Sequence, residues 1–351
     1  MNLNEYKKFD ALDVSNMYAA IEGLPEQLAD AFALGMQQPL PEFTGLKYII
    51  VAGMGGSAIG SDLLAGYMEG RASLPLTVHR DYDLPAWAKG PETLVIASSH
   101  SGNTEETLSA FGRALENGCQ VVAVTRGGKL AKAAQGTRAA WWQFEHDGQP
   151  RAAVGFSFGL LLAMMNRLRV IPDPAEELAA AVAAMKARQA VLAADVPVAE
   201  NPAKQMAETL AGKWVSVFAS GMLSPVARRW KGQISEVAKA WAQFEYLPET
   251  DHNTLAGVFH PKALLPQMRM VFLGSASDHE RNKLRLKLTR KVFEDAGLQS
   301  LAFQAAGDDA LSQMWTTLHF GDYLAYYLAM TYEVDPTPVE AIDSLKKNLV
   351  Q

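Results

Sequence analysis

The segment Tyr48–Ile49–Ile50–Val51–Ala52, which runs directly into Gly53–Met54–Gly55–Gly56–Ser57, decides the fold class of this chain. Its first half is apolar and β-branched, as in a buried strand, and the glycines that follow end the strand in a turn. The residues from Ala58 to Met68 are helix-like in composition. We therefore predict a strand, a glycine turn and a helix, which is the opening of an α/β fold.

The alternation of strand and helix continues downstream. Further strands are expected at Leu76–His79, Thr93–Ala97 and Gln120–Thr125. Between the last two strands, apolar residues at i, i+3 and i+7 predict a helix; they are Leu108, Phe111 and Leu115. Because strands that alternate with helices usually pair in parallel, we expect a parallel sheet flanked by helices.

The second half of the chain repeats this pattern in a weaker form. Strands are predicted at Trp214–Ala219, before Gly221, and at Met270–Leu273, before a further glycine. An Ala-rich stretch from Asp173 to about Pro202 is predicted as a solvated connecting helix. We expect two tandem domains, residues 1–190 and 191–351. The second copy lacks the full set of glycines and hydroxyls, so a site built on them would exist once per chain.

Length and composition indicate a globular protein of two domains. The chain has 351 residues, of which 49% are hydrophobic and 20% charged, and its net charge is −6. This acidic balance favours neither nucleic acid nor a membrane surface as a partner. The most apolar stretch, Gly155–Met165, is shorter than the roughly 20 residues of a membrane span, so a buried helix is expected there. The single cysteine, Cys119, excludes an intrachain disulfide and agrees with a cytoplasmic location.

Two turns at the ends of predicted strands carry glycines and hydroxyls that suit an anion of phosphate size. Free backbone N–H groups at a helix start and nearby hydroxyls are good phosphate ligands. The candidates are Gly55, Gly56, Ser57, Ser99, Ser101 and Thr104. One alternative is that Asn103 or Thr104 only caps a helix. Another is a dinucleotide fingerprint at Gly53-x-Gly55, with His79–Arg80–Asp81 at the next strand end.

Three further side chains are candidates for chemistry. Arg151 follows a proline beside the apolar segment. Glu236 shares a predicted helix with Arg228, Arg229 and Lys231. These four side chains are either a set of helix-surface ion pairs or place a carboxylate base, Glu236, near an anionic substrate. His252 lies in a polar loop and can act as an acid or base near neutral pH. No motif calls for a bound metal or cofactor.

Taken together, these motifs resemble the bifunctional phosphoglucose/phosphomannose isomerase family, whose members contain two sugar isomerase (SIS) domains. The resemblance runs in order from about residue 40 to the C-terminus. The motifs that carry it are Gly53–Ser57, Ser99–Thr107, Pro150–Ala153, Trp230–Glu236, Leu247–Glu249 with His252–Asn253, and Asp335–Val339.

The resemblance implies an activity and residue roles. It implies a homodimer that interconverts glucose 6-phosphate or mannose 6-phosphate with fructose 6-phosphate, without a metal. The glycine and serine turns would hold the phosphate, and Glu236 would be the base that moves a proton through a cis-enediolate. Arg151 would stabilise the enediolate. His252 from the partner subunit and Lys346, which adjoins Lys347, would assist ring opening, and Thr337 is a possible sugar-facing hydroxyl.

The chain departs from the family pattern at three positions. The family often has tyrosine where this chain has His100, a glutamate where it has Thr254, and an asparagine where it has Val237. The glutamate would orient His252 or raise its basicity, so its loss bears on the rate. A second hypothesis is therefore a catalytically impaired SIS protein that binds a sugar phosphate as a sensor. A nucleotide-dependent oxidoreductase is a third.

Overall fold

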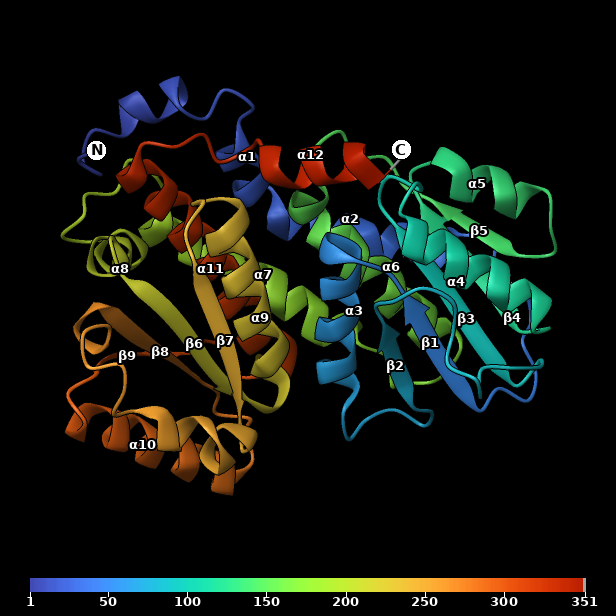
Figure 1. Cartoon of the computed structure of the whole chain (residues 1–351). Helices are drawn as coiled ribbons and strands as arrows, with labels where there is room; N and C mark the ends of the chain where they lie inside the picture. The colour runs from blue at the N-terminus through green and yellow to red at the C-terminus, as the bar shows by residue number, and fades with distance from the viewer. Residues whose placement is uncertain (350–351) are drawn as a thin grey trace. The chain divides into compact units, whose positions relative to one another are not determined.

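The computed structural model describes residues 1–349 and divides into two compact units (Figure 1). The first unit is Gly23–Ala183 with Asp309–Leu311. The second unit is Met1–Glu22, Ala184–Asp308 and the residues from Ser312 on. The division lies inside helix α7 (Ala175–Leu192), and the chain begins in the second unit. That residues 1–190 and 191–351 are separate folding domains stays a prediction.

The first unit confirms the predicted parallel sheet. Its strand order is β2-β1-β3-β4-β5, and every neighbouring pair is parallel. The strands are β1 (Tyr48–Ala52), β2 (Leu76–His79), β3 (Thr93–Ser99), β4 (Gln120–Thr125) and β5 (Ala140–Gln143). All residues of β3 are buried, so the strand that leads into the serine loop lies in the core.

The helices of the first unit include the ones predicted after β1 and after β3. The unit contains α2 (Leu24–Gln37), α3 (Gly55–Met68), α4 (Glu105–Glu116), α5 (Gly128–Gln135), the 3-10 turn η2 (Pro150–Ala153) and α6 (Val154–Arg167). Helix α6 contains the apolar stretch and is buried, as predicted. It packs tightly on α2, because a Cβ at Gly35 would lie 2.6 Å from the Cβ of Ala163.

The second unit repeats the architecture with a smaller parallel sheet. Its strand order is β7-β6-β8-β9. The strands are β6 (Trp214–Ser220), β7 (Ala242–Leu247), β8 (Met268–Gly274) and β9 (Gln299–Gln304). The helices are α1 (Met17–Glu22), α8 (Pro202–Leu210), α9 (Ser224–Glu236), α10 (Glu280–Asp295), α11 (Ala310–Tyr332) and α12 (Glu340–Leu349). The short 3-10 turns are η1 (Tyr6–Ala11), η3 (Gly221–Leu223), η4 (Glu249–His252), η5 (Thr254–Gly257) and η6 (Leu265–Gln267).

Helices α9 and α11 of the second unit pack closely against each other. The indole of Trp230 on α9 donates a hydrogen bond of 2.9 Å to the carbonyl of Thr317 on α11. A Cβ at Gly321 would lie 2.1 Å from the Trp230 Nε1, so only glycine fits there. Arg229 is buried and pairs with Asp322 through two bonds, of 3.1 and 2.7 Å. The expectation of helix-surface ion pairs is therefore wrong for Arg229.

A buried lysine anchors the N-terminal segment. The ammonium of Lys204, on α8, donates hydrogen bonds to the carbonyls of Leu3, Ala194 and Val196 at 2.9, 2.6 and 2.8 Å. The side chain is 1% exposed, and the rings of Phe9 and Tyr327 lie beside it. Three carbonyls match the three donors of an ammonium group.

In the described residues, none of the helices reaches the length and apolarity that crossing a membrane requires.

Candidate active site

The serine loop between β3 and α4 leaves its hydroxyls facing one another. Thr104 occupies the N-cap position of α4, but its side chain makes no capping hydrogen bond. Its hydroxyl instead lies 2.9 Å from that of Ser99, which also accepts the N–H of Gly102 at 3.1 Å. The side chain of Asn103 accepts the N–H of Lys129, in the first turn of α5. Neither Asn103 nor Thr104 therefore caps α4 with its side chain, and Ser101 remains exposed at the loop tip.

The conformation of this loop depends on one glycine. Gly102 has φ +67°, and a Cβ there would lie 1.8 Å from the carbonyl oxygen of Gly127. No other residue fits such a close approach at positive φ. The loop is thus held against the segment that follows β4, which fixes its shape before any ligand binds.

The glycine turn after β1 lies beside the serine loop. Helix α3 begins at Gly55, so the N–H groups of Gly55 and Gly56 are in its first turn. Ser57 follows and is buried, and its hydroxyl accepts the N–H of His100 at 3.1 Å. The two turns that the sequence singled out therefore meet at the carboxyl edge of the first sheet, where an anion would find amides and hydroxyls together.

Arg151 lies against the same turn. A Cβ at Gly56 would lie 2.5 Å from the carbonyl oxygen of Pro150 and 3.1 Å from the amide nitrogen of Arg151. The Arg151 residue is 3% exposed. The hydroxyl of Ser157, on the helix that follows, donates to the carbonyl of Ser57 at 2.9 Å. The first unit thus brings Arg151 to the glycine turn through backbone contacts.

Glu236 is the last residue of α9, in the second unit. The ammonium of Lys239 donates hydrogen bonds to the carbonyls of Glu236 and Pro336, at 2.6 and 3.3 Å. The turn that contains Thr337 is therefore tied to the end of α9. Val237 follows and is fully buried, so its side chain serves packing. Nothing in the sequence predicted the bridge through Lys239.

His252 ends the 3-10 turn η4, which follows β7. Its neighbour Asp251 accepts hydrogen bonds from Arg285 and Thr289 on α10, at 2.7 and 2.6 Å. This anchor holds the turn and leaves the His252 side chain exposed. The hydroxyl of Thr254 donates to the side chain of Asn253 at 3.0 Å. Within residues 1–349, the imidazole of His252 makes no side-chain hydrogen bond, and it faces solvent.

Glu236 and His252 of one chain lie toward opposite edges of the second sheet. Helix α9 follows β6 and packs back along β6 and β7, so Glu236 lies near the strands' amino ends. His252 follows the carboxyl end of β7. Strand β7, whose six residues span about 20 Å at about 3.3 Å per residue, therefore runs between the two ends at which Glu236 and His252 lie.

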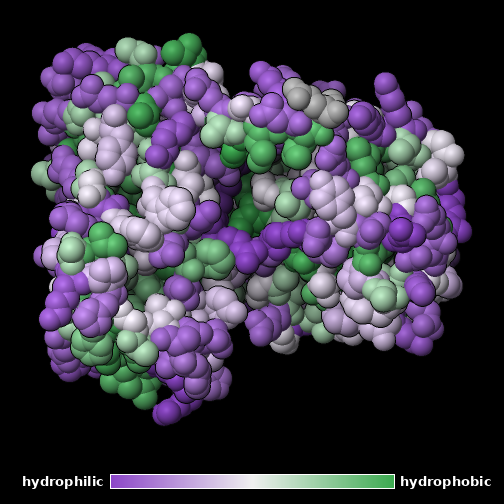
Figure 2. Space-filling view, in the orientation of Figure 1, coloured by the Kyte–Doolittle hydropathy of each residue, from purple (hydrophilic) through white to green (hydrophobic). Residues whose placement is uncertain are grey.

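Lys346 and Lys347 lie on the C-terminal helix α12, and both are exposed. One side of α12 is apolar at the surface, where Figure 2 shows green side chains. Ile342, Leu345 and Leu349 are 40, 60 and 59% exposed. The helix therefore offers both a cationic and an apolar face.

The corresponding strand end in the second unit is occupied by the chain's own carboxylate. The hydroxyl of Ser220, at the end of β6, donates to Asp278. A Cβ at Gly221 would lie 2.8 Å from the Asp278 Oδ1. An anion that approached this turn would meet a negative charge already in place. The contact supports the expectation that the anion site occurs once per chain.

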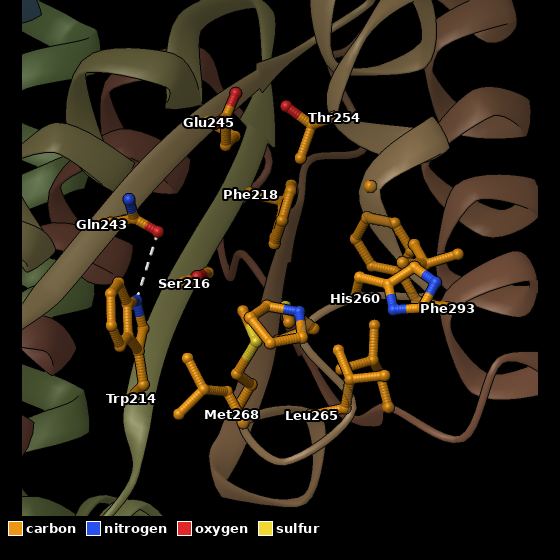
Figure 3. A pocket seen from close by; sticks show the side chains of 16 residues that line it. Trp214, Ser216, Phe218, Gln243, Glu245, Thr254, His260, Leu265, Met268 and Phe293 are labelled. Atoms are coloured by element: carbon orange, nitrogen blue, oxygen red, sulfur yellow. Dashed lines mark hydrogen bonds between the residues drawn. The ribbon is translucent and has the colours of Figure 1, made fainter.

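A pocket of about 200 Å³ lies on one face of the second sheet (Figure 3). Trp214 donates its indole N–H to the side chain of Gln243 at 3.2 Å, while Phe293 and Met268 supply apolar walls. The Glu245 carboxylate lies among the lining groups and would repel a phosphate. The pocket contains none of the predicted site residues, so the anion chemistry is not located there.

The parallel sheets and the serine loop define a protein of the SIS class. Residues 199–349 match the family described as bacterial phospho-glucose isomerase C-terminal SIS domain. The solved structure of tagatose-6-phosphate ketose/aldose isomerase from Escherichia coli is similar, with a TM-score of 0.67. The structural match covers 92% of this chain and 95% of the Escherichia coli chain. The two sequences are 15% identical, so this likeness concerns the fold.

Whole-length relatives identify the family. The bifunctional phosphoglucose/phosphomannose isomerase of Caldicellulosiruptor bescii is 35% identical over 337 residues, which cover 95% of this chain and 99% of that one. The protein of the same name from Aquifex aeolicus is 30% identical over 96% of this chain and 99% of its own length. The chain belongs to the bifunctional phosphoglucose/phosphomannose isomerase family.

Proposed function

We propose that this protein is an isomerase of hexose 6-phosphates, which interconverts glucose 6-phosphate, mannose 6-phosphate or both with fructose 6-phosphate. The observation that carries the proposal is the meeting of the serine loop, the glycine turn and Arg151 in one unit. Family membership supports the reaction class. It gives no support to the sensor or to the nucleotide-dependent oxidoreductase.

The phosphate serves as a handle remote from the reacting carbons. Its ligands are the hydroxyls of Ser57, Ser99, Ser101 and Thr104 and the amides of Gly55 and Gly56. Binding energy gained there positions C1 and C2 of the open-chain sugar for reaction. This local cradle explains how a protein of net charge −6 attracts an anionic substrate.

The chemical step is a proton transfer between neighbouring carbons. The Glu236 carboxylate removes the C2 proton of the aldose, which leaves a cis-enediolate; the hydroxyl proton passes from O2 to O1, and Glu236 returns its proton to C1 to give the ketose. The guanidinium of Arg151 offsets the charge that develops on the enediolate oxygens. His252 and Lys346 assist opening of the sugar ring by proton transfer. None of these steps requires a metal or a redox cofactor.

The active form is a homodimer in which His252 acts in its partner's site. The placement of Glu236 and His252 toward opposite ends of β7, whose six residues span about 20 Å at about 3.3 Å each, supports this arrangement. The exposed His252 ring, held outward by Asp251, also supports it. We place the protein in the cytoplasm, where hexose phosphates are metabolised.

The test is turnover of fructose 6-phosphate by purified protein in the presence of EDTA, with both aldose products quantified. We expect one or both aldoses to form. Glu236→Gln should lower kcat by about 10²- to 10⁴-fold because the base is lost. Glu245→Gln, which changes a glutamate of the same unit outside the site, is the matched control. Absence of product at high enzyme concentration, or full activity of the Glu236→Gln variant, would refute the proposal.

A further inference from the structure

A pair of histidines joins the serine loop to the segment that leads to Arg151. His100, within the loop, is 8% exposed, and its Nε2 lies 3.1 Å from the Nδ1 of His146. His146 lies between β5 and η2, in the stretch that continues to Pro150 and Arg151. One nitrogen donates and the other accepts, so the contact is a directional hydrogen bond.

Aromatic rings enclose the pair. The ring centroid of Phe144 lies 5.8 Å from that of His100, and Phe156 lies 6.0 Å from His146. The rings of Phe144 and Phe156 stack on each other at 5.1 Å. A Cβ at Gly148 would lie 2.7 Å from the His146 ring, so the backbone closes on the imidazole. This packing restricts both rings and strengthens their hydrogen bond by excluding water.

Burial and the charges around the pair keep both rings neutral at neutral pH. Burial, together with the smaller effects of the neighbouring His146 and Arg126, lowers the pKa of His100 to about 4. Burial and Arg126 also lower the pKa of His146, while Asp147 and the Gly148 backbone oppose the shift. Arg126 and Asp147 pair with each other at 3.2 Å. The hydrogen bond thus joins two neutral imidazoles under working conditions.

His100 connects three segments of the site. Its backbone N–H donates to the Ser57 hydroxyl, which fixes the glycine turn, and its ring holds His146. On the other side, Gly56 packs against Pro150. Two independent contacts therefore set the position of Arg151 relative to the anion loop.

We propose that the His100–His146 hydrogen bond positions Arg151 relative to the phosphate, so that His146 affects turnover without touching the substrate. This inference rests on the proposed function. A misplacement of about 1 Å can cost up to about 100-fold in rate. His146 is therefore a positioning residue, and its contribution should depend on the presence of Arg151.

The first test is a double-mutant cycle with fructose 6-phosphate as substrate. His146→Phe keeps an aromatic ring against Phe156 but removes the hydrogen bond. It should lower kcat about 10- to 100-fold with KM changed less than about threefold, because the phosphate ligands remain. His146→Asn keeps a polar atom near the Nδ1 position and should stay within about threefold of the wild type. In the Arg151→Ala background, His146→Phe should have almost no further effect.

The outcomes separate this inference from the proposed function. An inactive wild type contradicts the proposed function. If the wild type is active, two results overturn the positioning role. Either His146→Phe leaves kcat unchanged, or it lowers kcat by the same factor in the Arg151→Ala background as in the wild type. His146→Ala gives the same comparison if the Phe variant does not fold, and His260→Asn is the control for an exposed histidine.

A second measurement does not depend on turnover. Amide hydrogen exchange of residues 148–153 should be at least about tenfold faster in His146→Phe than in the wild type, and near the wild-type rate in His146→Asn. Unchanged exchange in His146→Phe would overturn the inference even if the enzyme proved inactive.

Discussion

The buried pair of Arg229 and Asp322 shows how much one side chain can matter to this fold. Both side chains are 4% exposed and joined by two hydrogen bonds. Asp322→Asn leaves the Arg229 charge buried without its counter-ion. We expect the free energy of unfolding to fall by about 3–5 kcal/mol, measured by urea denaturation.

Controls distinguish this penalty from a general loss of charge. Asp295→Asn removes an exposed carboxylate from α10 and should change stability by less than about 1 kcal/mol. The double variant Arg229→Met, Asp322→Leu should recover most of the loss, because no unpaired charge remains. A stable Asp322→Asn protein would show that water reaches the guanidinium.

At the residue scale, the sequence predicted those site groups that lie close together along the chain. Ser99, Ser101 and Thr104 fall within one loop, so their spacing alone indicated an anion site. The His100–His146 contact joins residues 46 positions apart, and Arg229–Asp322 joins residues 93 apart. No local pattern encodes such pairs, because tertiary packing alone brings them together.

At the scale of single elements, Lys204 determines whether the N-terminal segment stays attached. Lys204→Met keeps the apolar stem but leaves the carbonyls of Leu3, Ala194 and Val196 without this donor. We expect stability to fall by about 1–3 kcal/mol, because buried carbonyls lose their partner. Limited proteolysis should then cut within residues 1–16 faster than in the wild type.

Lys213→Met is the matched control, because Lys213 makes one exposed bond to Gln267. It should leave the proteolysis pattern unchanged. Equal cleavage of the N-terminal segment in wild type and Lys204→Met would mean that the aromatic contacts of Phe9 suffice to hold it.

Elements with a strong local signal were predicted well, and those without one were not. The β1–α3 and β3–α4 units carry β-branched runs and glycine turns, and both are confirmed. Strand β5, with the sequence Ala-Trp-Trp-Gln, has only four residues and no β-branched side chain. Strand β7 has two polar residues that line a pocket. Both strands are specified by pairing with a neighbouring strand, which local sequence patterns do not reveal.

At the scale of the whole molecule, the shared active site can be tested by mixing inactive variants. Glu236→Gln and His252→Asn should each have little activity alone. If each site combines Glu236 of one chain with His252 of the other, half of the dimers in an equal mixture are hybrids. Each hybrid has one intact site, so subunit exchange should restore about a quarter of wild-type activity.

Two results would count against this arrangement. A mixture that stays inactive after subunit exchange, verified by mass spectrometry of the hybrid dimers, would place both groups in one chain. A protein that sediments as a monomer while turning over substrate would exclude the shared site altogether.

The N-terminal segment has a consequence for synthesis. Residues 1–22 leave the ribosome long before their packing partners on α11, which include Tyr323, Tyr326 and Tyr327. At about 5–20 residues per second, the segment waits roughly a quarter of a minute to a minute for those tyrosines. Meanwhile the residues of the first unit emerge and can fold. A segment made early is thus among the last to find its place, and in a nascent chain it is open to proteolytic cleavage throughout that interval.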